Sequence, residues 1–389
     1  MSFPISKFNK ISTPFYYYDL ALLEANIVAL RNASNPEYIV HYALKANANN
    51  RILQVIKNNG IGADCVSGNE VKKAVEVGFS PSEIAFAGVG KSDEEILVAL
   101  QNDIFCFNSE SGEEIKVINE LAVKSGKIAR IALRINPNVH ANTHKYITTG
   151  LEENKFGINM WELDSVMELL KSCTNIKLLG IHFHIGSQIN DLGNFKNLCT
   201  KANEVQLWFA ERNYVLEHVN VGGGLGVDYH KPDENSTPDY KGYFEVFKKF
   251  LELRKGQQLH FELGRAIVAQ CGSLISKVLY VKKGVNTSFV ILDAGMTELI
   301  RPALYQSYHK IENISEHLTS NLQLPTSRYD VVGPICESSD CFGKAVMLPE
   351  TTRGDLFAIR TTGAYGEVMA SNYNLREKAK AIYSDYELK

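Results

Sequence analysis

Short apolar runs alternate with longer amphipathic stretches from about residue 20 to residue 265. Eight of these runs are almost continuously apolar, which is typical of parallel strands covered on both faces. They span residues 38–44, 61–66, 83–88, 103–108, 128–136, 176–186, 216–222 and 258–263. Eight strands separated by helices over roughly 250 residues match the rhythm of a (β/α)8 barrel. A doubly wound sheet has the same alternation, and periodicity alone leaves both architectures open.

Helix boundaries are marked between several of these strands. Residues 92–95 (SDEE) and 111–114 (SGEE) both fit the capping box, in which a serine and a glutamate satisfy free backbone N–H groups. Residues 242–256 predict a helix that ends in basic residues and a glycine. The longest irregular stretch, 137–158, is long enough to predict a functional loop.

The pattern of apolar and polar residues changes after residue 270. Short strand-like segments follow one another, punctuated by Gly, Pro, Asn and Asp, at 273–283, 287–295, 329–337, 344–350 and 355–366. A further strand-like segment, 13–20, lies outside the count of eight. We therefore expect a barrel domain over residues 19–268, and a β domain built from residues 1–18 and 269–389.

Composition agrees with two soluble domains, since 389 residues exceed what one compact core usually holds. A net charge of −3 gives no general attraction to nucleic acid or anionic membranes. Seven cysteines, without zinc-like spacing, predict reduced thiols. The first residues lack a signal-peptide layout, and no apolar run approaches the ~20 residues that span a bilayer. We expect a cytoplasmic protein.

Polar residues at the ends of barrel strands point to chemistry, because the carboxyl ends of the strands form the active-site face. Lys45 closes the first strand. It is either a salt-bridged structural residue or an amine nucleophile, and desolvation would favour the neutral amine. His182 and His184 follow the sixth strand with both rings on one face. The two histidines could bind a metal, although no third ligand is obvious. Alternatively, one of the two rings could stack on a cofactor.

Two further strand ends complete the pattern. Residues 222–226 (GGGLG) form either a plain turn or a site where backbone N–H groups bind a phosphate after the seventh strand. Glu262 and Arg265 follow the eighth strand, either as an ion pair or with separate partners. An amine, a flat ring, a carboxylate and a phosphate site together suit pyridoxal 5'-phosphate (PLP), whose ring nitrogen a carboxylate keeps protonated.

At this point the chain resembles the fold-type III PLP-dependent decarboxylases, which include the ornithine, arginine and diaminopimelate decarboxylases. The resemblance covers essentially the whole chain. It rests on six motifs in order, YALKAN (42–47), HIGSQ (184–188), GGG (222–224), ExGR (262–265), CESSD (336–340) and GAYG (363–366). It implies an α/β plus β fold, a PLP-binding (β/α)8 TIM-like barrel with a C-terminal β-sandwich or barrel domain.

The resemblance also implies roles for individual residues. Lys45 would bind the cofactor aldehyde and His184 would stack on its ring, while Glu262 would pair with the pyridinium nitrogen. The phosphate would be held by Ser187, Gly224, Arg265 and Tyr365, and Gly223 and Gly264 would also bind the cofactor. Cys336 would be the proton donor, contributed by the neighbouring subunit of a homodimer. Asp64 and Glu70 match acidic positions near the lysine and the cofactor.

Substrate choice would depend on other residues. Residues 301–305 (RPALY) resemble a motif of the diaminopimelate enzymes, in which Arg301, Tyr305 and Glu337 would hold the distal end of the substrate, beside Arg265 and Tyr365. Diaminopimelate carries a second carboxylate and a second amine at that end, so an arginine and an acid suit it. An unpaired arginine would penalise substrates without that carboxylate.

Two departures and several rival functions accompany this resemblance. Leu263 replaces the usual proline of the EPGR motif, and Ala266 replaces the serine that usually follows it, but the functional side chains remain. The rivals are an ornithine, arginine or carboxynorspermidine decarboxylase, an alanine racemase, a non-catalytic PLP-binding protein and a metal-dependent barrel enzyme. Lys45 and Cys336 argue against a silent binder, and Cys336 in its CESSD setting argues against a racemase.

Overall fold

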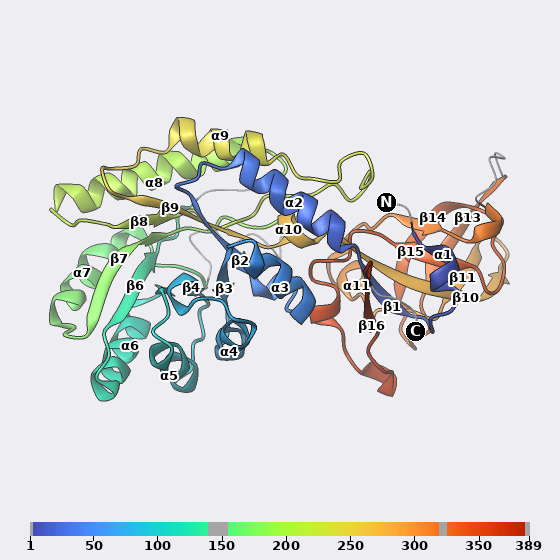
Figure 1. Cartoon of the computed structure of the whole chain (residues 1–389), viewed down its shortest axis with the longest axis horizontal. Helices are drawn as coiled ribbons and strands as arrows, with labels where there is room; N and C mark the ends of the chain where they lie inside the picture. The colour runs from blue at the N-terminus through green and yellow to red at the C-terminus, as the bar shows by residue number, and fades with distance from the viewer. Residues whose placement is uncertain (1–2, 139–154, 319–324, 386–389) are drawn as a thin grey trace. The chain divides into compact units, whose positions relative to one another are not determined.

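The computed structural model describes residues 3–138, 155–318 and 325–385 and divides the chain into two compact units (Figure 1). One unit comprises Ile27–Gly226 and Asp239–Ile267. The other comprises Met1–Asn26, Val227–Pro238 and Val268–Lys389. The predicted loop at 137–158 lies outside the described residues from 139 to 154. The functional domain boundaries at 18/19 and 268/269 stay a prediction.

The first unit is a closed barrel of parallel strands, which confirms the barrel and excludes the doubly wound sheet. Its strands run in chain order around the barrel, and the last pairs with the first, so that Val40 lies beside Phe261. The strands are β2 Ile39–Ala43, β3 Gly62–Cys65, β4 Ile84–Phe86, β5 Cys106–Ser109, β6 Ala129–Arg134, β7 Ile176–His182, β8 His218–Asn220 and β9 Gln258–Leu263. All eight fall within the predicted runs, except that β5 ends one residue later.

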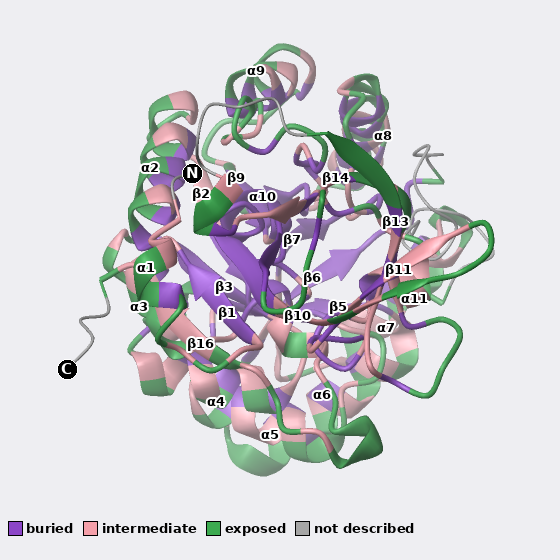
Figure 2. Ribbon diagram, turned by 90° about the vertical axis from the view of Figure 1, so that its right-hand side faces the viewer, coloured by how far each residue is buried: buried purple, intermediate pink, exposed green. Residues whose placement is uncertain are grey.

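Helices cover the outside of the barrel, and their buried faces pack on the strands (Figure 2). Those that follow the strands are α3 Asn50–Asn58, α4 Gly68–Val77, α5 Asp93–Gln101, α6 Gly112–Ser125, α7 Leu163–Ser172, α8 Gly193–Glu211, α9 Tyr240–Phe250 and the short α10 Arg265–Val268. Helix α2, Leu20–Ala33, precedes the first barrel strand. No helix in the described ranges is long and apolar enough to cross a membrane.

The two predicted capping boxes differ in outcome. At the start of α5, Ser92 and Glu95 form the full reciprocal pair, as predicted. At the start of α6, the Ser111 side chain accepts from the Glu114 N–H, but the other half of the prediction is wrong. The Glu114 carboxylate accepts instead from the N–H of Glu110 and from Lys91. Tertiary partners have replaced the local bond.

The helix predicted over 242–256 is shifted in the structure. Helix α9 begins at Tyr240, where the Asp239 side chain accepts from the Gly242 N–H, and ends at Phe250. The cause is Asn203 of α8, whose amide donates to the Phe250 carbonyl and accepts from the Glu252 N–H. These bonds hold the chain extended after Leu251, so the predicted end at Gly256 is wrong.

The second unit contains an eight-stranded, mostly antiparallel sheet. Its described strands are β1 Phe15–Tyr18, β10 Gly272–Lys283, β11 Ser288–Leu292, β12 Ile311–Asn313, β13 Thr326–Val332, β14 Cys341–Pro349, β15 Leu356–Ile359 and β16 Lys380–Tyr383. The expectation that the segment 13–20 joins this domain is confirmed, because β1 pairs with β10 and β16. The unit also contains α1 Ile5–Phe8 and α11 Arg301–Tyr305. Its core includes Phe8, Phe15 and Ile275.

Candidate active site

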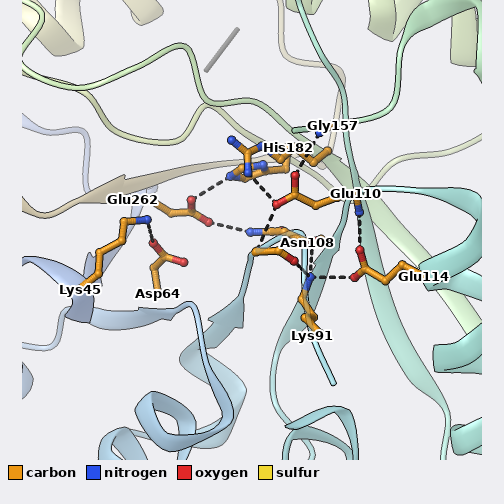
Figure 3. A network of polar contacts seen from close by, with 11 residues as sticks. Lys45, Asp64, Lys91, Asn108, Glu110, Glu114, Gly157, His182 and Glu262 are labelled. Carbon is orange, nitrogen blue, oxygen red and sulfur yellow. Dashed lines mark hydrogen bonds and ion pairs between the residues drawn. The ribbon is translucent and has the colours of Figure 1, made fainter. Parts of the chain in front are cut away.

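The carboxyl ends of the barrel strands bring together polar side chains that lie far apart in the sequence (Figure 3). Lys45 follows β2 on a short 3-10 turn, Leu44–Ala46, and Asp64 lies on β3. Asn108 lies on β5, and His182 and Glu262 lie at the ends of β7 and β9. Since parallel strands in a barrel all end at the same rim, these groups meet there.

Glu262 is the centre of this group. Its Oε1 accepts hydrogen bonds from Asn108 Nδ2 at 2.8 Å and Asn220 Nδ2 at 2.7 Å, and its Oε2 lies 2.8 Å from His182 Nε2. Burial by itself would raise the pKa of Glu262, but the charge and hydrogen bond of His182 and the charge of Lys45 hold the pKa below its usual value. The site therefore keeps a buried carboxylate ionised.

Lys45 lies beside a second buried carboxylate. Its Nζ is 3.5 Å from Asp64 Oδ2, and the Asp64 side chain is fully buried. Burial and the negative charge of Glu262 raise the pKa of Asp64 to about 8, against the opposing charge of Lys45. The carboxylate of Glu70 accepts from the Val66 N–H at 2.7 Å. Asp64 thus contacts Lys45, and Glu70 lies near enough for the charge of Lys45 to oppose the rise that burial causes in the Glu70 pKa. Both acidic residues were expected near the lysine.

The glycine segment after β8 closes tightly on the barrel. A Cβ at Gly223 would collide with the Glu262 carbonyl oxygen, and one at Gly222 with that of Phe183. Gly224 has a φ of +111°, and its Cβ would lie 2.7 Å from the Gly186 carbonyl oxygen. Only glycine fits these positions, so the segment is more constrained than a plain flexible turn. The N–H groups of Gly222 and Gly223 donate to Asn220 Oδ1 and His184 Nδ1, so the Gly224 N–H is the donor that this glycine cradle could offer to an anion.

His184 lies against this glycine segment. The Gly223 N–H donates to His184 Nδ1 at 3.4 Å. Burial, followed by the positive charges of Arg134 and Lys45, lowers the pKa of His184 well below its ordinary value, so the ring is neutral. His182 and His184 therefore have different partners, a carboxylate and a backbone N–H. A neutral ring beside the cradle suits stacking on a flat cofactor.

Arg265 and Ser187 meet beside the same cradle. Arg265 Nη2 donates to Ser187 Oγ at 2.9 Å, and Arg265 is only 7% exposed. Gly264 lets the turn approach β2, because its Cβ would lie 3.0 Å from Ala46 Cβ. Arg265 and Glu262 thus have separate partners rather than forming an ion pair with each other. The guanidinium and the hydroxyl could both donate to a phosphate.

A second set of buried charges lies behind Asn108, and the sequence analysis missed it. Lys91 Nζ donates to Glu114 Oε1 at 2.7 Å and to the Asn108 carbonyl at 3.0 Å. Glu110 accepts from Arg134 Nη1 at 2.7 Å and from the Gly157 N–H at 3.0 Å. Asn108 and Asn220 were missed as well, and they could have been found only as polar residues ending buried strands. Lys91 and Glu114 gave no comparable signal.

The remaining predicted residues belong to the second unit. Arg301 is buried, donates to the Tyr229 hydroxyl at 2.7 Å and lies over that ring. Tyr305 ends α11. Cys336 is an exposed free thiol, and Glu337 accepts a hydrogen bond from the Tyr373 hydroxyl at 2.9 Å.

Tyr365 adopts a φ of +57°, inside the GAYG motif. A Cβ at the preceding Gly363 would collide with the Val268 carbonyl oxygen. The backbone of this motif is therefore closely packed, and this packing fixes the position of the Tyr365 backbone.

These barrel residues fit PLP. Lys45 could supply the amine for the aldehyde, and Glu262 could be the ionised partner for a protonated ring nitrogen. Ser187 and Arg265 could supply donors for the phosphate beside the glycine cradle. Within the described residues, Asp64 Oδ1 and His182 Nδ1 are buried polar atoms without a hydrogen-bond partner, as expected where a polar ligand belongs.

Comparison with known proteins agrees with this chemistry. Residues 20–269 match the family of the pyridoxal-dependent decarboxylases over its pyridoxal binding domain. Diaminopimelate decarboxylase of Bacteroides thetaiotaomicron is 57% identical over 385 residues, covering 98% of each chain. The crystal structure of diaminopimelate decarboxylase from Helicobacter pylori complexed with L-lysine matches with a TM-score of 0.90 at 40% identity, over 98% of this chain and 93% of that one.

A more distant structure bears on the fold alone. The arginine decarboxylase of Paramecium bursaria Chlorella virus matches with a TM-score of 0.85 at 22% identity, over 97% of this chain and 98% of that one. The barrel with a separate sheet unit is thus an arrangement that this wider group shares. Taken with the site and the full-length relatives, these matches show that the chain belongs to the pyridoxal-dependent decarboxylase family, among the diaminopimelate decarboxylases.

Proposed function

We propose that this chain converts meso-diaminopimelate to L-lysine and carbon dioxide, the last step of bacterial lysine synthesis. The observation that carries the proposal is that an amine, Lys45, and a buried carboxylate, Glu262, lie at the same rim of the barrel. Glu262 is hydrogen-bonded to three neighbours, and the charges of His182 and Lys45 hold its pKa low. The names of the full-length relatives support the substrate.

The barrel residues would bind and orient the cofactor. Bound PLP supplies an electron sink for the pair that the substrate α-carbon releases when carbon dioxide leaves. Glu262 would hold the proton on the ring nitrogen, and Lys45 would bind the cofactor through Nζ. His184 would lie along the ring, while Ser187, Gly224 and Arg265 would donate to the phosphate. A fixed ring is what aligns the bond to be broken.

The second unit would supply the proton donor and the substrate contacts. In this proposal the Cys336 thiol gives its proton to the α-carbon after carbon dioxide has left. Arg301 and Tyr305 bind the distal carboxylate, Glu337 binds the distal amine, and Tyr365 contributes to the phosphate site. Arg301 already has one donor committed to Tyr229, and a guanidinium has five N–H donors, so others remain for a carboxylate.

The proposal includes a homodimer with shared sites, in the cytoplasm. Cys336 would serve the partner subunit, and it is the one cysteine of the seven with an exposed side chain, which suits a residue that acts on a neighbouring subunit. The seven free thiols support a reducing compartment.

The test is a visible absorbance spectrum of the purified protein before and after meso-diaminopimelate is added, with lysine and carbon dioxide measured in the same tube. A cofactor band that shifts on addition while lysine appears is the expected result. A band without lysine would overturn the substrate and bring forward ornithine, arginine and carboxynorspermidine. The absence of a band after incubation with PLP would overturn the cofactor site.

Shared active sites predict complementation between inactive variants. Cys336→Ala should form lysine slowly because the α-carbon lacks its proton donor, and Lys45→Ala should be inactive. A mixture that exchanges subunits should recover about one quarter of wild-type activity, because half the dimers are mixed and one of their two sites is intact. The mixture is assayed for lysine after reversible dissociation. A mixture no more active than its components would contradict a site built from two subunits.

A further inference from the structure

Lys91 is a buried ammonium group with no assigned part in the proposed chemistry. Its side chain is 1% exposed, and it lies in the loop between β4 and α5. Nζ donates to the Gly88 carbonyl at 2.8 Å, to the Asn108 carbonyl at 3.0 Å and to Glu114 Oε1 at 2.7 Å. Its three donors are therefore all used, and two of them hold backbone at the ends of β4 and β5.

Glu114 completes this arrangement from the first turn of α6. Its second oxygen accepts from the Glu110 N–H at 2.9 Å. The ion pair therefore holds the backbone on both sides of Ser109, through the Asn108 carbonyl and the Glu110 N–H. Burying an ion pair costs desolvation, and apolar residues of similar volume are often as stabilising. Beyond any effect on stability, the pair of Lys91 and Glu114 therefore fixes the backbone at the end of β5.

Asn108 connects the Lys91–Glu114 ion pair to the proposed cofactor site. Lys91 holds its main-chain carbonyl, and its side-chain amide donates to Glu262 Oε1 at 2.8 Å (Figure 3). The amide nitrogen must face Glu262, because a carboxylate only accepts. Asn220 donates to the same oxygen from β8, and its own Oδ1 accepts from the Gly222 N–H at 2.9 Å. With His182 of β7 on its other oxygen, Glu262 is thus held from three strands, of which only β5 depends on Lys91.

We propose that Lys91, paired with Glu114, is a positioning residue for the carboxylate that meets the cofactor ring nitrogen. It acts by fixing the backbone of Asn108, whose amide in turn fixes the direction of Glu262. The inference rests on the proposed function, specifically on the pairing of Glu262 with that nitrogen. A lysine that only stabilised the loops would affect every ligand of the barrel equally.

The experiment measures the affinity of the full-length protein, freed of cofactor and reloaded, for PLP and for its 1-deaza analogue, in which a C–H replaces the ring nitrogen. The ratio of the two affinities isolates the Glu262 contact, since the aldehyde and phosphate are common to both. Wild type should prefer PLP by about 10- to 100-fold, the range for a hydrogen bond to a charged group. Glu262→Gln should lose most of that preference.

Lys91→Met alone would leave Glu114 buried without its cation, so the decisive protein is the double variant Lys91→Met with Glu114→Gln. Its preference should fall about threefold to tenfold, while its affinity for the analogue stays within about twofold of wild type. The matched control is Lys116→Met with Glu113→Gln, which removes an exposed ion pair from the same helix and should change neither affinity.

The outcomes separate the two proposals. If Glu262→Gln loses the preference but the double variant keeps it, or loses affinity for both ligands equally, the inference about Lys91 is overturned and the proposed function stands. If wild type itself shows no preference, the pairing of Glu262 with the ring nitrogen is overturned, and the inference falls with it.

A second measurement tests the route through Asn108. Asn108→Ala should lower the preference for PLP over the analogue when it is made in wild type. In the double variant it should lower this preference little further, because the contact between Asn108 and Glu262 is already displaced there. Asn220→Ala should lower it by a similar factor in both backgrounds. Additive effects for Asn108→Ala would contradict the route.

Discussion

Replacing Lys45 with alanine should lower lysine formation from meso-diaminopimelate by at least about a thousandfold, because the amine proposed to bind the cofactor aldehyde is lost. The replacement also removes the cation beside Asp64. That carboxylate is fully buried and its pKa is already raised to about 8, so the variant protonates it at neutral pH and avoids an unpaired buried charge.

Lys45→Arg separates the two roles of the lysine. The guanidinium keeps a positive charge for Asp64 but stays protonated and is a poor nucleophile. We expect Lys45→Arg to be as inactive as Lys45→Ala, although it should melt closer to wild type. Added methylamine should partly restore Lys45→Ala, which has room for it, and leave Lys45→Arg inactive.

The measurements are lysine formation, cofactor absorbance and thermal unfolding. Lys72→Arg, at an exposed position on α4, is the matched control and should keep full activity. Steady turnover by either Lys45 variant without added amine would remove this residue from its proposed role.

The features that the sequence predicts well are those set by local pattern. Continuous apolar runs located all eight barrel strands, because a strand covered on both faces needs apolar residues at every position. Ser92 and Glu95 predicted the start of α5, since all partners of a capping box lie within one helical turn. Lys45, Glu262 and Arg265 stood out because each is a charged residue within two residues of the end of a buried run.

The features that sequence pattern missed depend on closure of the barrel. Asn108 and Asn220 meet at one oxygen of Glu262 although they lie 154 and 42 residues from it in the chain. Glu114 has a capping-box position but gives its carboxylate to Lys91, 23 residues away. No pattern within one element indicates which distant strand end will arrive beside it. The roles assigned to Cys336 and Arg301 still rest on the resemblance.

Three buried histidines inside the barrel were also missed, and they predict strong acid sensitivity. His41, His218 and His260 are each at most 2% exposed and lie on β2, β8 and β9. His41 Nδ1 lies 3.0 Å from the Glu83 carbonyl, so it carries a proton, and in a neutral ring Nε2 then accepts from His260 Nδ1, also at 3.0 Å. Within the described residues, the Nε2 atoms of His218 and His260 have no partner.

Burial lowers the pKa of all three rings. The pKa of His218 falls to about 3 through burial and the charges of His41 and His182, and that of His260 to about 2 through burial and its two histidine neighbours. The negative charge of Glu262 opposes these shifts without cancelling them. The folded barrel therefore keeps these rings neutral at a pH where the unfolded chain protonates them.

The free energy of unfolding should accordingly fall as the pH is lowered below about 6.5, the value for an unperturbed histidine. Between that pH and the folded pKa of about 3 for His218, the unfolded chain binds more protons, so acid favours unfolding. Each ring contributes about 1.4 kcal/mol per pH unit, and His218 and His260 together roughly 3 kcal/mol per pH unit. Above pH 7 the contribution is constant.

His218→Phe isolates one ring, because phenylalanine keeps an aromatic group beside Phe105 but cannot bind a proton. Urea unfolding at pH 7.5, 6.5 and 5.5 should show a shallower loss of stability for this variant, by about 1.4 kcal/mol per pH unit below 6.5. His230→Phe removes an exposed ring and should leave the slope of wild type unchanged. Parallel curves for wild type and His218→Phe would mean that this ring is not held neutral, and that acid sensitivity arises from the carboxylates instead.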